Sequence, residues 1–216
     1  MLTKRVLTIA SVAFAVVIGM SLTARAQEQE PWYTFNVGGG YSPLLGQLHT
    51  RLDNGWHITA GAGFRASSHF EVTGQFTYNG FGVQSLVIDE AGTPSANSNL
   101  WSITADPKLR FRGGHHFDPY LVGAVGYFRR TVNFTAPTLT AVTVIDPFFG
   151  VYPVLEPANV QLGSISRGGI GGNGGFGFEF RLGQSRTKLF VEGRYEYAAT
   201  GNLPTRMIPV TLGLSW

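Results

Sequence analysis

The sequence contains no cysteine, and no long run of apolar residues follows its first 20 positions. The missing thiols exclude a disulfide framework and thiol chemistry. No later stretch approaches the roughly 18 consecutive apolar residues of a membrane-spanning helix. Basic residues form no cluster, whereas a nucleic-acid interface depends on a clustered basic surface. These absences exclude disulfide scaffolds, helical membrane proteins and nucleic-acid-binding proteins.

The N-terminus has the three parts of a secretory signal peptide. Lys4 and Arg5 form a positive region, an apolar run covers residues 6–20, and Ala24-Arg25-Ala26 is an A-x-A cleavage site. The run is shorter than the about 20 apolar residues of a comfortable transmembrane helix, and an uncleaved anchor is the alternative. We therefore expect residues 1–26 to be a cleaved signal peptide.

The mature chain, residues 27–216, is formally neutral, because cleavage leaves 13 basic residues against 13 acidic ones. Its many glycines and few helical periodicities are typical of an all-β protein. Apolar and polar residues alternate in eight segments, each near the 9–11 residues of a tilted membrane-spanning strand. The segments cover residues 32–42, 56–65, 70–79, 101–112, 119–129, about 167–182, 189–197 and 208–216.

The C-terminal segment is the most informative of the eight. Every second residue is apolar, so that one strand face is uniformly apolar and the other is small or polar. Such a strand invites aggregation at the edge of a soluble protein, but in a closed membrane barrel its apolar face meets lipid. We expect its apolar residues to form an insertion signal that the barrel-assembly machinery recognises: Val210, Leu212, Leu214 and Trp216.

The connections between the segments alternate in length, as in an up-and-down barrel with its N-terminus in the periplasm. Residues 66–69, 113–118 and 183–188 are short connections, and residues 43–55, 80–99, about 130–166 and 198–206 are longer ones. Aromatic residues fall at both ends of the segments, where a barrel crosses the two membrane interfaces. They are Tyr33, Phe64, Phe70, Phe111, Phe180 and Trp216 at the short-turn end, and Tyr41, Trp56, Tyr78, Trp101 and Tyr197 at the other.

This pattern, the run Phe190-Val-Glu-Gly-Arg-Tyr-Glu-Tyr197 and the terminal Trp216 resemble the small outer-membrane barrels of the OmpA-like or OmpX-like superfamily. The resemblance covers residues 32–216. It implies an eight-stranded antiparallel up-and-down transmembrane β-barrel in the bacterial outer membrane, surrounded by its lipid. OmpA-like members often carry a peptidoglycan-binding domain after the barrel, and since this chain ends at Trp216, no cell-wall link is expected.

Nine charged residues share the polar faces of their strands, which a barrel turns inward. An eight-stranded barrel is just wide enough for side chains to fill it, and buried charges must pair. We expect a structural network in which the arginines neutralise the glutamates, with a gate or proton path as the alternative. The apolar residues 119–129 do not reveal which face points inward. The network residues are Glu71, Asp106, Lys108, Arg110, Glu179, Arg181, Glu192, Arg194 and Glu196.

The expected function is non-enzymatic, in envelope integrity or in surface interaction through the outer loops. The longest loop, about 130–166, alternates weakly and carries several apolar residues between Asp146 and Leu155. It is expected to be a hairpin or barrel extension that packs its aromatics over the barrel mouth, or a sticky outer surface for adhesion or ligand capture. An open diffusion pore is not expected, because an aqueous channel needs a much larger barrel.

Two alternatives remain open: a lipid A-modifying barrel enzyme and a soluble, lipocalin-like periplasmic binding protein. Acyl transfer needs a nucleophile, a base within hydrogen-bond reach and an oxyanion donor. No single strand face combines a serine with a histidine near the outer rim. His115 and His116 are adjacent and project to different sides, whereas zinc needs three or four converging ligands. No catalytic, cofactor-binding or metal-binding residue is predicted.

Overall fold

The computed structural model of the chain describes residues 31–84, 95–111, 117–146, 150–183, 185–201 and 203–216. The side chains of residues 95, 137–146 and 152–159 lie outside this description. The signal peptide predicted for residues 1–26 and the histidines at 115 and 116 also fall outside it. Cleavage at residue 26 therefore stays a prediction.

The described residues form strands and one short 3-10 helix, η1 (Gly46–Leu48). They contain no helix with the length and apolarity that a membrane span requires. The strands are β1 (Tyr33–Ser42), β2 (Gly55–Arg65), β3 (Phe70–Gly82), β4 (Ser95–Arg110), β5 (Phe117–Asp146), β6 (Gly150–Arg181), β7 (Lys188–Ala198), β8 (Thr205–Met207) and β9 (Val210–Ser215).

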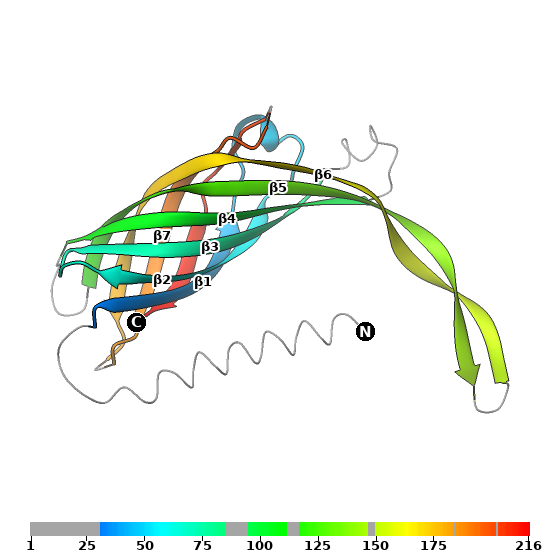
Figure 1. Cartoon of the computed structure of the whole chain (residues 1–216), viewed down its shortest axis with the longest axis horizontal. Coiled ribbons are helices and arrows are strands. Elements are labelled where there is room, and N and C mark those ends of the chain that lie inside the picture. The colour runs from blue at the N-terminus through cyan, green and yellow to red at the C-terminus, as the bar shows by residue number, and fades with distance from the viewer. Residues whose placement is uncertain (1–30, 85–94, 112–116, 147–149, 184, 202) are drawn as a thin grey trace.

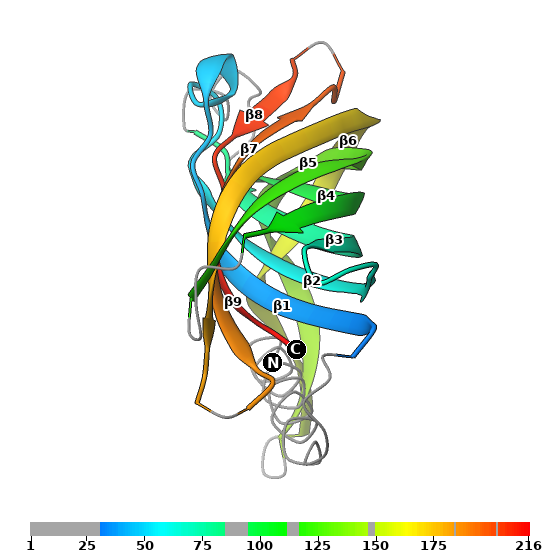
Figure 2. The same cartoon turned by 90° about the vertical axis from the view of Figure 1, so that its left-hand side faces the viewer.

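The strands close into an antiparallel barrel (Figure 1, Figure 2). Neighbouring strands pair in order from β1 to β7, and β9 pairs with both β7 and β1. Because β8 and β9 pair with successive parts of β7, they form one position of the ring. The Trp216 N–H donates to the Phe35 carbonyl at 3.0 Å, and the Phe35 N–H donates to the Trp216 carbonyl at 2.9 Å. The predicted eight-stranded up-and-down barrel is confirmed.

The last strand of the ring is interrupted between β8 and β9, where the sequence predicted a continuous strand from Ile208. Pro209 has no N–H to donate to a ladder, so regular pairing breaks there. The chain nevertheless stays in place, because the Ile208 N–H donates to the Pro43 carbonyl at 3.0 Å and the Arg194 N–H donates to the Pro209 carbonyl at 3.1 Å.

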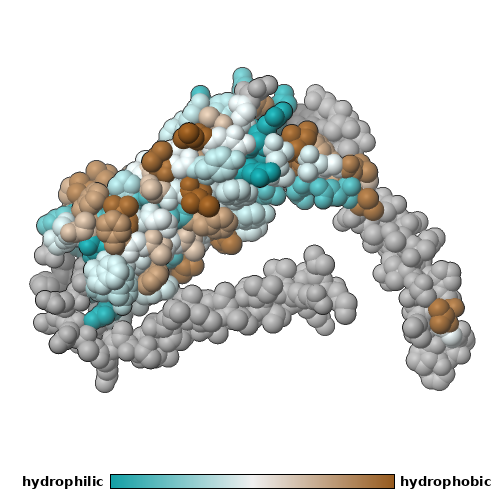
Figure 3. Space-filling view, in the orientation of Figure 1, coloured by the Kyte–Doolittle hydropathy of each residue, from teal (hydrophilic) through white to brown (hydrophobic). Residues whose placement is uncertain are grey.

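The outer face of the barrel is apolar, as the alternation predicted. Ile58, Ile103 and Val125 are each more than half exposed to the surroundings, and apolar residues are visible along the barrel wall in Figure 3. The aromatics at both ends of the strands also point outward. A wall of this composition, closed on itself without a free barrel edge, is suited to lipid. In the C-terminal strand, Val210 and Leu212 are exposed and Leu214 and Trp216 are half-buried.

The connections follow the predicted alternation with one exception. Residues 66–69, 111–116 and 182–187 separate strands at one end, and residues 43–54, 83–94 and 199–204 do so at the other. The exception is the range 130–166, where β5 and β6 continue as one long paired hairpin. The hairpin interpretation of this range is therefore correct, but the hairpin extends away from the barrel instead of covering its mouth (Figure 1).

Candidate functional site

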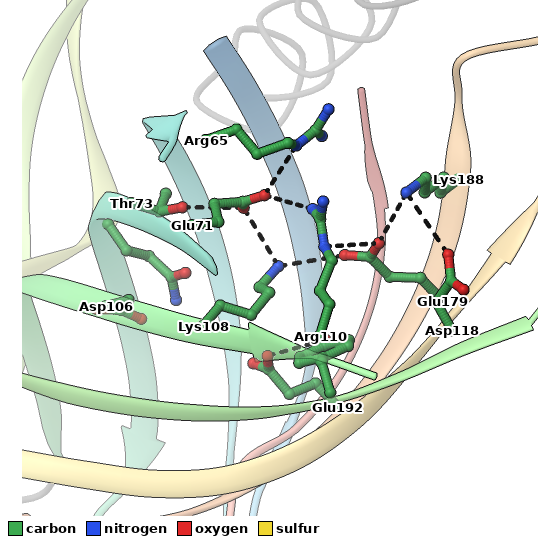
Figure 4. A network of polar contacts seen from close by, with 12 residues as sticks. Arg65, Glu71, Thr73, Asp106, Lys108, Arg110, Asp118, Glu179, Lys188 and Glu192 are labelled. Carbon is green, nitrogen blue, oxygen red and sulfur yellow. Dashed lines mark hydrogen bonds and ion pairs between the residues drawn. The ribbon is translucent and has the colours of Figure 1, made fainter. Parts of the chain in front are cut away.

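The first region of interest is a cluster of charges inside the barrel, near the end with the short connections (Figure 4). Glu71 on β3 is 1% exposed and lies among three cations. Its carboxylate is 3.6 Å from the Lys108 Nζ and 3.5 Å from the Arg65 Nε, and it also contacts the Arg110 guanidinium. Burial of this carboxylate is possible because each oxygen faces a positive charge.

A second buried carboxylate, Glu179 on β6, shares two of these cations. Its oxygens lie 3.3 Å from the Lys108 Nζ and 3.4 Å from the Arg110 Nε. The Lys188 Nζ on β7 lies at 3.3 Å from Glu179 and 3.9 Å from Asp118. Lys108 and Arg110 thus bridge β3 and β6 across the lumen, and the network ties together strands that are not neighbours in the ring.

Arg194 on β7 organises a second charged layer, farther from the short connections. Its guanidinium contacts the carboxylate of Asp106, and its Nε donates to a Glu192 carboxylate oxygen at 2.5 Å. It also donates to the side-chain carbonyls of Asn173 at 3.2 Å and Gln75 at 3.4 Å. Two carboxylates and two amides therefore surround one arginine and accept four hydrogen bonds from its five N–H donors.

Tyr120 connects the two charged layers and reveals the orientation of the fifth strand, which the sequence left unassigned. Its hydroxyl donates to Glu192 at 2.9 Å, and the Lys108 Nζ lies 4.6 Å from the centre of its ring. Tyr120, Val122 and Phe128 face the lumen and are buried, whereas Leu121 and Val125 face outward. Alternation within an apolar strand could not show this, because both faces are apolar.

The structure places eight of the nine predicted network residues inside the barrel and one outside. Arg181 is exposed at the end of β6, so its expected place in the buried network was wrong. It alternates in step with the inward-facing Glu179 but is the last residue of β6. Glu196 on β7 is buried beside the charged layer around Arg194, and its Oε1 has no hydrogen-bond partner among the described residues.

Sequence reasoning also missed members of the network. Lys188 was assigned to a turn, although it is separated from Glu192 and Arg194 by even numbers of residues and therefore lies on the same strand face. Starting the seventh strand one residue earlier would have placed it inside. Arg65, at the end of β2, and Asp118, at the start of β5, are further members at strand ends.

A buried histidine lies farther along the lumen. The His57 Nδ1 is 2.9 Å from the Ser42 hydroxyl, which donates to the Asn79 side-chain carbonyl at 2.8 Å, and the His57 Nε2 is 2.9 Å from the Thr211 hydroxyl. This serine–histidine pair joins β1 to β2 and was invisible to a search along single strands. Ser42 is 0% exposed and His57 is 3% exposed, so both side chains are almost completely covered.

The outer end of the lumen is closed by an apolar cluster that the sequence did not predict. Leu44, Leu48 and Leu52 come from the first outer connection and fold inward with η1. They meet inward-facing residues at the outer ends of the strands, including Leu100 and Phe128, both 0% exposed. The first outer connection therefore acts as a lid whose apolar side chains exclude water from the mouth.

The described residues fill the lumen from both ends. A cavity in the charged region, lined among others by Gln75, Asp106 and Arg194, measures about 10 Å³, which is about the smallest space that holds one water. Among the described residues, no group of three or more histidine, aspartate or glutamate side chains could hold a metal ion. The interior is arranged as a packed core of ions and apolar groups.

The second region of interest is the hairpin formed by the outer parts of β5 and β6. The last β4–β5 pair joins Ser95 to Thr135, and the last β6–β7 pair joins Gly171 to Ala198. Beyond these points the two strands, as far as they are described, pair only with each other, out to Asp146 and Gly150. The register shifts between Phe134 and Thr135, and a bulge at this point bends the strands away from the barrel.

Few charges and several exposed apolar residues mark this hairpin. Its residues 136–170 contain three charged residues, Asp146, Glu156 and Arg167. Val151, Val160, Leu162 and Ile165 are exposed, at 67%, 46%, 58% and 56% of their surfaces. Exposed apolar groups outside the lipid-facing wall are typical of contact surfaces.

Three prolines lie on the two edges of the hairpin. The partner pairs that contain them are Pro137 with Asn159, Leu139 with Pro157, and Thr143 with Pro153. Along β5 these pairs are two and four residues apart, so all three are pairs of the same kind in the alternating antiparallel ladder. Because proline has no N–H to donate, they are the pairs whose N–H groups point away from the partner strand, toward the open edges of the hairpin. The prolines therefore remove donors from the open edges.

Comparisons with known proteins agree with this architecture. The model of a family described as outer membrane protein beta-barrel domain matches residues 12–215. The crystal structure of Neisserial surface protein A is 16% identical, covers 87% of this chain and 98% of its own, and superposes with a TM-score of 0.55. That of Ail, the attachment invasion locus protein of Yersinia pestis, is 16% identical, covers 85% and 97%, and has a TM-score of 0.47.

A third similar structure is the N-terminal β-barrel domain of Pseudomonas aeruginosa OprF, which is 12% identical, covers 87% of this chain and 100% of its own, and has a TM-score of 0.43. No curated protein matches the chain. The likeness to the solved structures concerns the fold alone, whereas the family match covers most of the sequence. The chain therefore belongs to the outer membrane protein beta-barrel domain family and is a protein of the bacterial outer membrane.

Proposed function

We propose that this protein is a non-enzymatic surface protein, in which the barrel is a sealed anchor and the projecting β5–β6 hairpin is the contact region. The observation that carries the proposal is the continuation of β5 and β6 beyond all their barrel partners. A paired extension of this length adds nothing to closure of the barrel. Its place is at the end with the long connections, which faces the cell exterior in an up-and-down barrel.

The filled interior supports an anchor over a channel. Ion pairs occupy one half of the lumen, and the apolar cluster with Leu100 and Phe128 closes the other. An ion that crossed the barrel would have to displace both layers, at the cost of breaking buried ion pairs. We expect purified protein in planar bilayers to show no steady ion conductance.

The buried Ser42–His57 pair supports a non-enzymatic role. Acyl transfer needs a nucleophile that a substrate can reach, and both residues are covered. We expect the mass of lipid A to be unchanged in cells that express the protein. An added or missing acyl chain would contradict this part of the proposal and return attention to the lipid A-modifying alternative.

Two further partners follow from the outer wall and the chain end. The exposed apolar residues of the strands contact outer-membrane lipid. The C-terminal strand, with Val210, Leu212, Leu214 and Trp216, is the segment that we assign to recognition by the barrel-assembly machinery. Two observations support this assignment: every second residue of the strand is apolar, and the strand pairs with β1, where the barrel closes.

The hairpin is tested by a replacement that leaves the barrel intact. Phe134 pairs with Gly163, so joining them through Asn-Gly removes residues 135–162, including the exposed Val151, Val160 and Leu162, and leaves matched strand ends for a tight turn. Cells displaying either form are compared for binding to immobilised extracellular-matrix proteins, to a hydrophobic surface and to one another. We expect binding by the full-length protein and none above background by the shortened one.

A matched control deletes residues 86–93 from the β3–β4 connection and is expected to bind like the full-length protein. Equal surface amounts and a gel band that shifts only on boiling show that each barrel is folded. Undiminished binding by the shortened protein, or no binding by the full-length protein to any of these surfaces, would overturn the proposed role of the hairpin.

A further inference from the structure

A groove on the outside of the barrel wall has no part in the function proposed above. It lies at the outer ends of β1–β4 and has a volume of about 560 Å³, within the roughly 300–1,000 Å³ of typical ligand sites. Its lining combines aromatic rings, glycines and amides.

The strand register explains how the groove is built. Tyr41 on β1 pairs with Trp56 on β2, Trp56 pairs with Gly80 on β3, and Gly80 pairs with Asn99 on β4. These four residues form a row across the outer face. Tyr41 and Trp56, each 54% exposed, form an aromatic wall, and Asn99 belongs to an amide wall. The glycine between them leaves the floor open.

The floor depends on the absence of side chains. A Cβ atom on Gly80 would lie 3.0 Å from the Trp56 indole, and one on Gly82 would lie 2.9 Å from the Asp53 carboxylate. Either substitution would push against a wall or fill the groove. The Trp56 and Tyr78 rings lie 5.9 Å apart at 46°, so the aromatic wall continues along the strand direction.

The amide wall is oriented by hydrogen bonds. The Asn97 side-chain carbonyl accepts from the Asn133 amide at 3.2 Å, and the Asn54 side-chain carbonyl accepts from the Leu44 N–H at 2.9 Å. Both residues line the groove, and each amide also carries an NH₂ group that can donate to a ligand. The groove therefore offers ring faces on one side and N–H donors on the other.

This chemistry matches a sugar more closely than a phosphate. A pyranose has apolar C–H faces that stack on aromatic rings and hydroxyls that bond to amides. Phosphate recognition uses arginine or lysine, and the described residues that line the groove include neither. The Asp53 carboxylate beside Gly82 repels an anion and accepts from a hydroxyl.

The position of the groove identifies the source of the sugar. It opens on the lipid-facing side of the wall, at the level of the outer aromatic girdle with Tyr41, Trp56 and Tyr78. Girdle aromatics lie among lipid headgroups, so a molecule in the groove is part of the outer leaflet. The geometry points to a site for the sugar headgroup of an outer-leaflet glycolipid, with Trp56 as the stacking platform and Asn97 and Asn99 as the hydroxyl-binding side.

The experiment titrates the folded, full-length mature protein in detergent and follows binding by native mass spectrometry. The probes are lipopolysaccharide with core sugars, the same material after dephosphorylation, phosphatidylethanolamine, and the core oligosaccharide without lipid. We expect both glycolipids to bind, and the phospholipid and the free oligosaccharide to bind at least about tenfold more weakly, a difference of about 1.4 kcal/mol.

Three variants connect binding to the groove. Trp56→Ala removes the platform and Gly80→Val fills the floor, and each is expected to weaken glycolipid binding at least about tenfold. Gly74→Val is the matched control, because Gly74 lies on the same outward face of β3 and its Cβ would meet only the Ala62 carbonyl, at 3.7 Å. Trp56 is exposed, so we expect the barrel to fold after its replacement. Trp56→Ala therefore still tests the proposal if the Gly80→Val protein does not fold.

Loss of binding on dephosphorylation would show a phosphate site and overturn the proposal. If phosphatidylethanolamine bound equally well, the groove would bind lipids without preference for a sugar, which would overturn the proposal. If the free oligosaccharide bound equally well, the site would not depend on the lipid part of the glycolipid, which would also overturn it. Binding unchanged by Trp56→Ala would place the glycolipid elsewhere on the barrel. Cell adhesion through the hairpin is a separate measurement, and its failure leaves this site untouched.

Discussion

The same two strands, β5 and β6, have opposite surroundings along their length. Inside the barrel each pairs on both edges, and their inward side chains, such as Tyr120 and Glu179, are fixed by partners from other strands. Beyond Thr135 and Gly171 they pair only with one another among the described residues. The comparison separates stability from recognition, because changes in the extension leave the barrel contacts in place while changes in the lumen disturb several strands at once.

The most severe test of this difference is Arg194→Met. The change leaves the buried carboxylates of Asp106 and Glu192 without their shared cation, and loss of one partner of a buried ion pair costs about 4 kcal/mol. We expect the free energy of unfolding to fall by about that amount, measured by urea titration of the barrel in lipid vesicles with tryptophan fluorescence.

Arg181→Met is the matched control, because Arg181 is exposed at the end of β6. Its effect is expected to stay within about 0.5 kcal/mol. Adding Asp106→Asn and Glu192→Gln to Arg194→Met should restore part of the loss, since the uncompensated charges disappear. If Arg194→Met and Arg181→Met lowered the free energy of unfolding equally, the lumen would be no more sensitive to the loss of a charge than the exposed strand end, which would contradict this comparison.

A smaller effect is expected from the apolar lid. Leu100→Ala removes part of a fully buried side chain that packs against the first outer connection, and such a deletion costs about 3 kcal/mol. Leu162→Ala makes the same chemical change in the hairpin, where the side chain is 58% exposed, and is expected to change stability by no more than about 0.5 kcal/mol. The same urea titration compares the two, and similar losses would contradict the division of roles.

The smallest effect is expected from salt. Buried ion pairs are screened much less than exposed ones, so raising NaCl from about 0.05 M to about 0.5 M should shift the free energy of unfolding by less than about 0.5 kcal/mol. A steep dependence on salt, measured by urea titration at each concentration, would mean that solvent and ions reach Glu71 and Glu179.

Much of the wall could be predicted from the sequence, because a membrane barrel imposes a two-residue period on every strand. Trp101 to Leu109 alternate so regularly that both faces of β4 were assigned correctly. The period fails where both faces are apolar, as around Tyr120, and at strand ends, where Lys188 enters the lumen and Arg181 leaves it. At those positions the outcome depends on where the strand meets its neighbours.

The contacts across the barrel were beyond the reach of a pattern. Ser42 and His57 meet because β1 and β2 pair in one particular register, and Leu48 joins the same apolar cluster as Leu100 only because an outer connection folds inward. Neither contact leaves a signal in local alternation. The hairpin was only weakly indicated, because apolar and polar residues alternate there less regularly than in the barrel strands.

The prolines of the hairpin have a consequence for how copies of this protein coexist in a crowded membrane. Between Pro153 and Pro157 the outer edge of β6 keeps a single outward N–H, that of Leu155, since donors on one edge recur at every second residue. A third strand added there finds neither a continuous row of donors nor a fixed register. Growth of a sheet from one copy to the next is interrupted, so a long, weakly charged extension can be displayed at high density without polymerising into fibres.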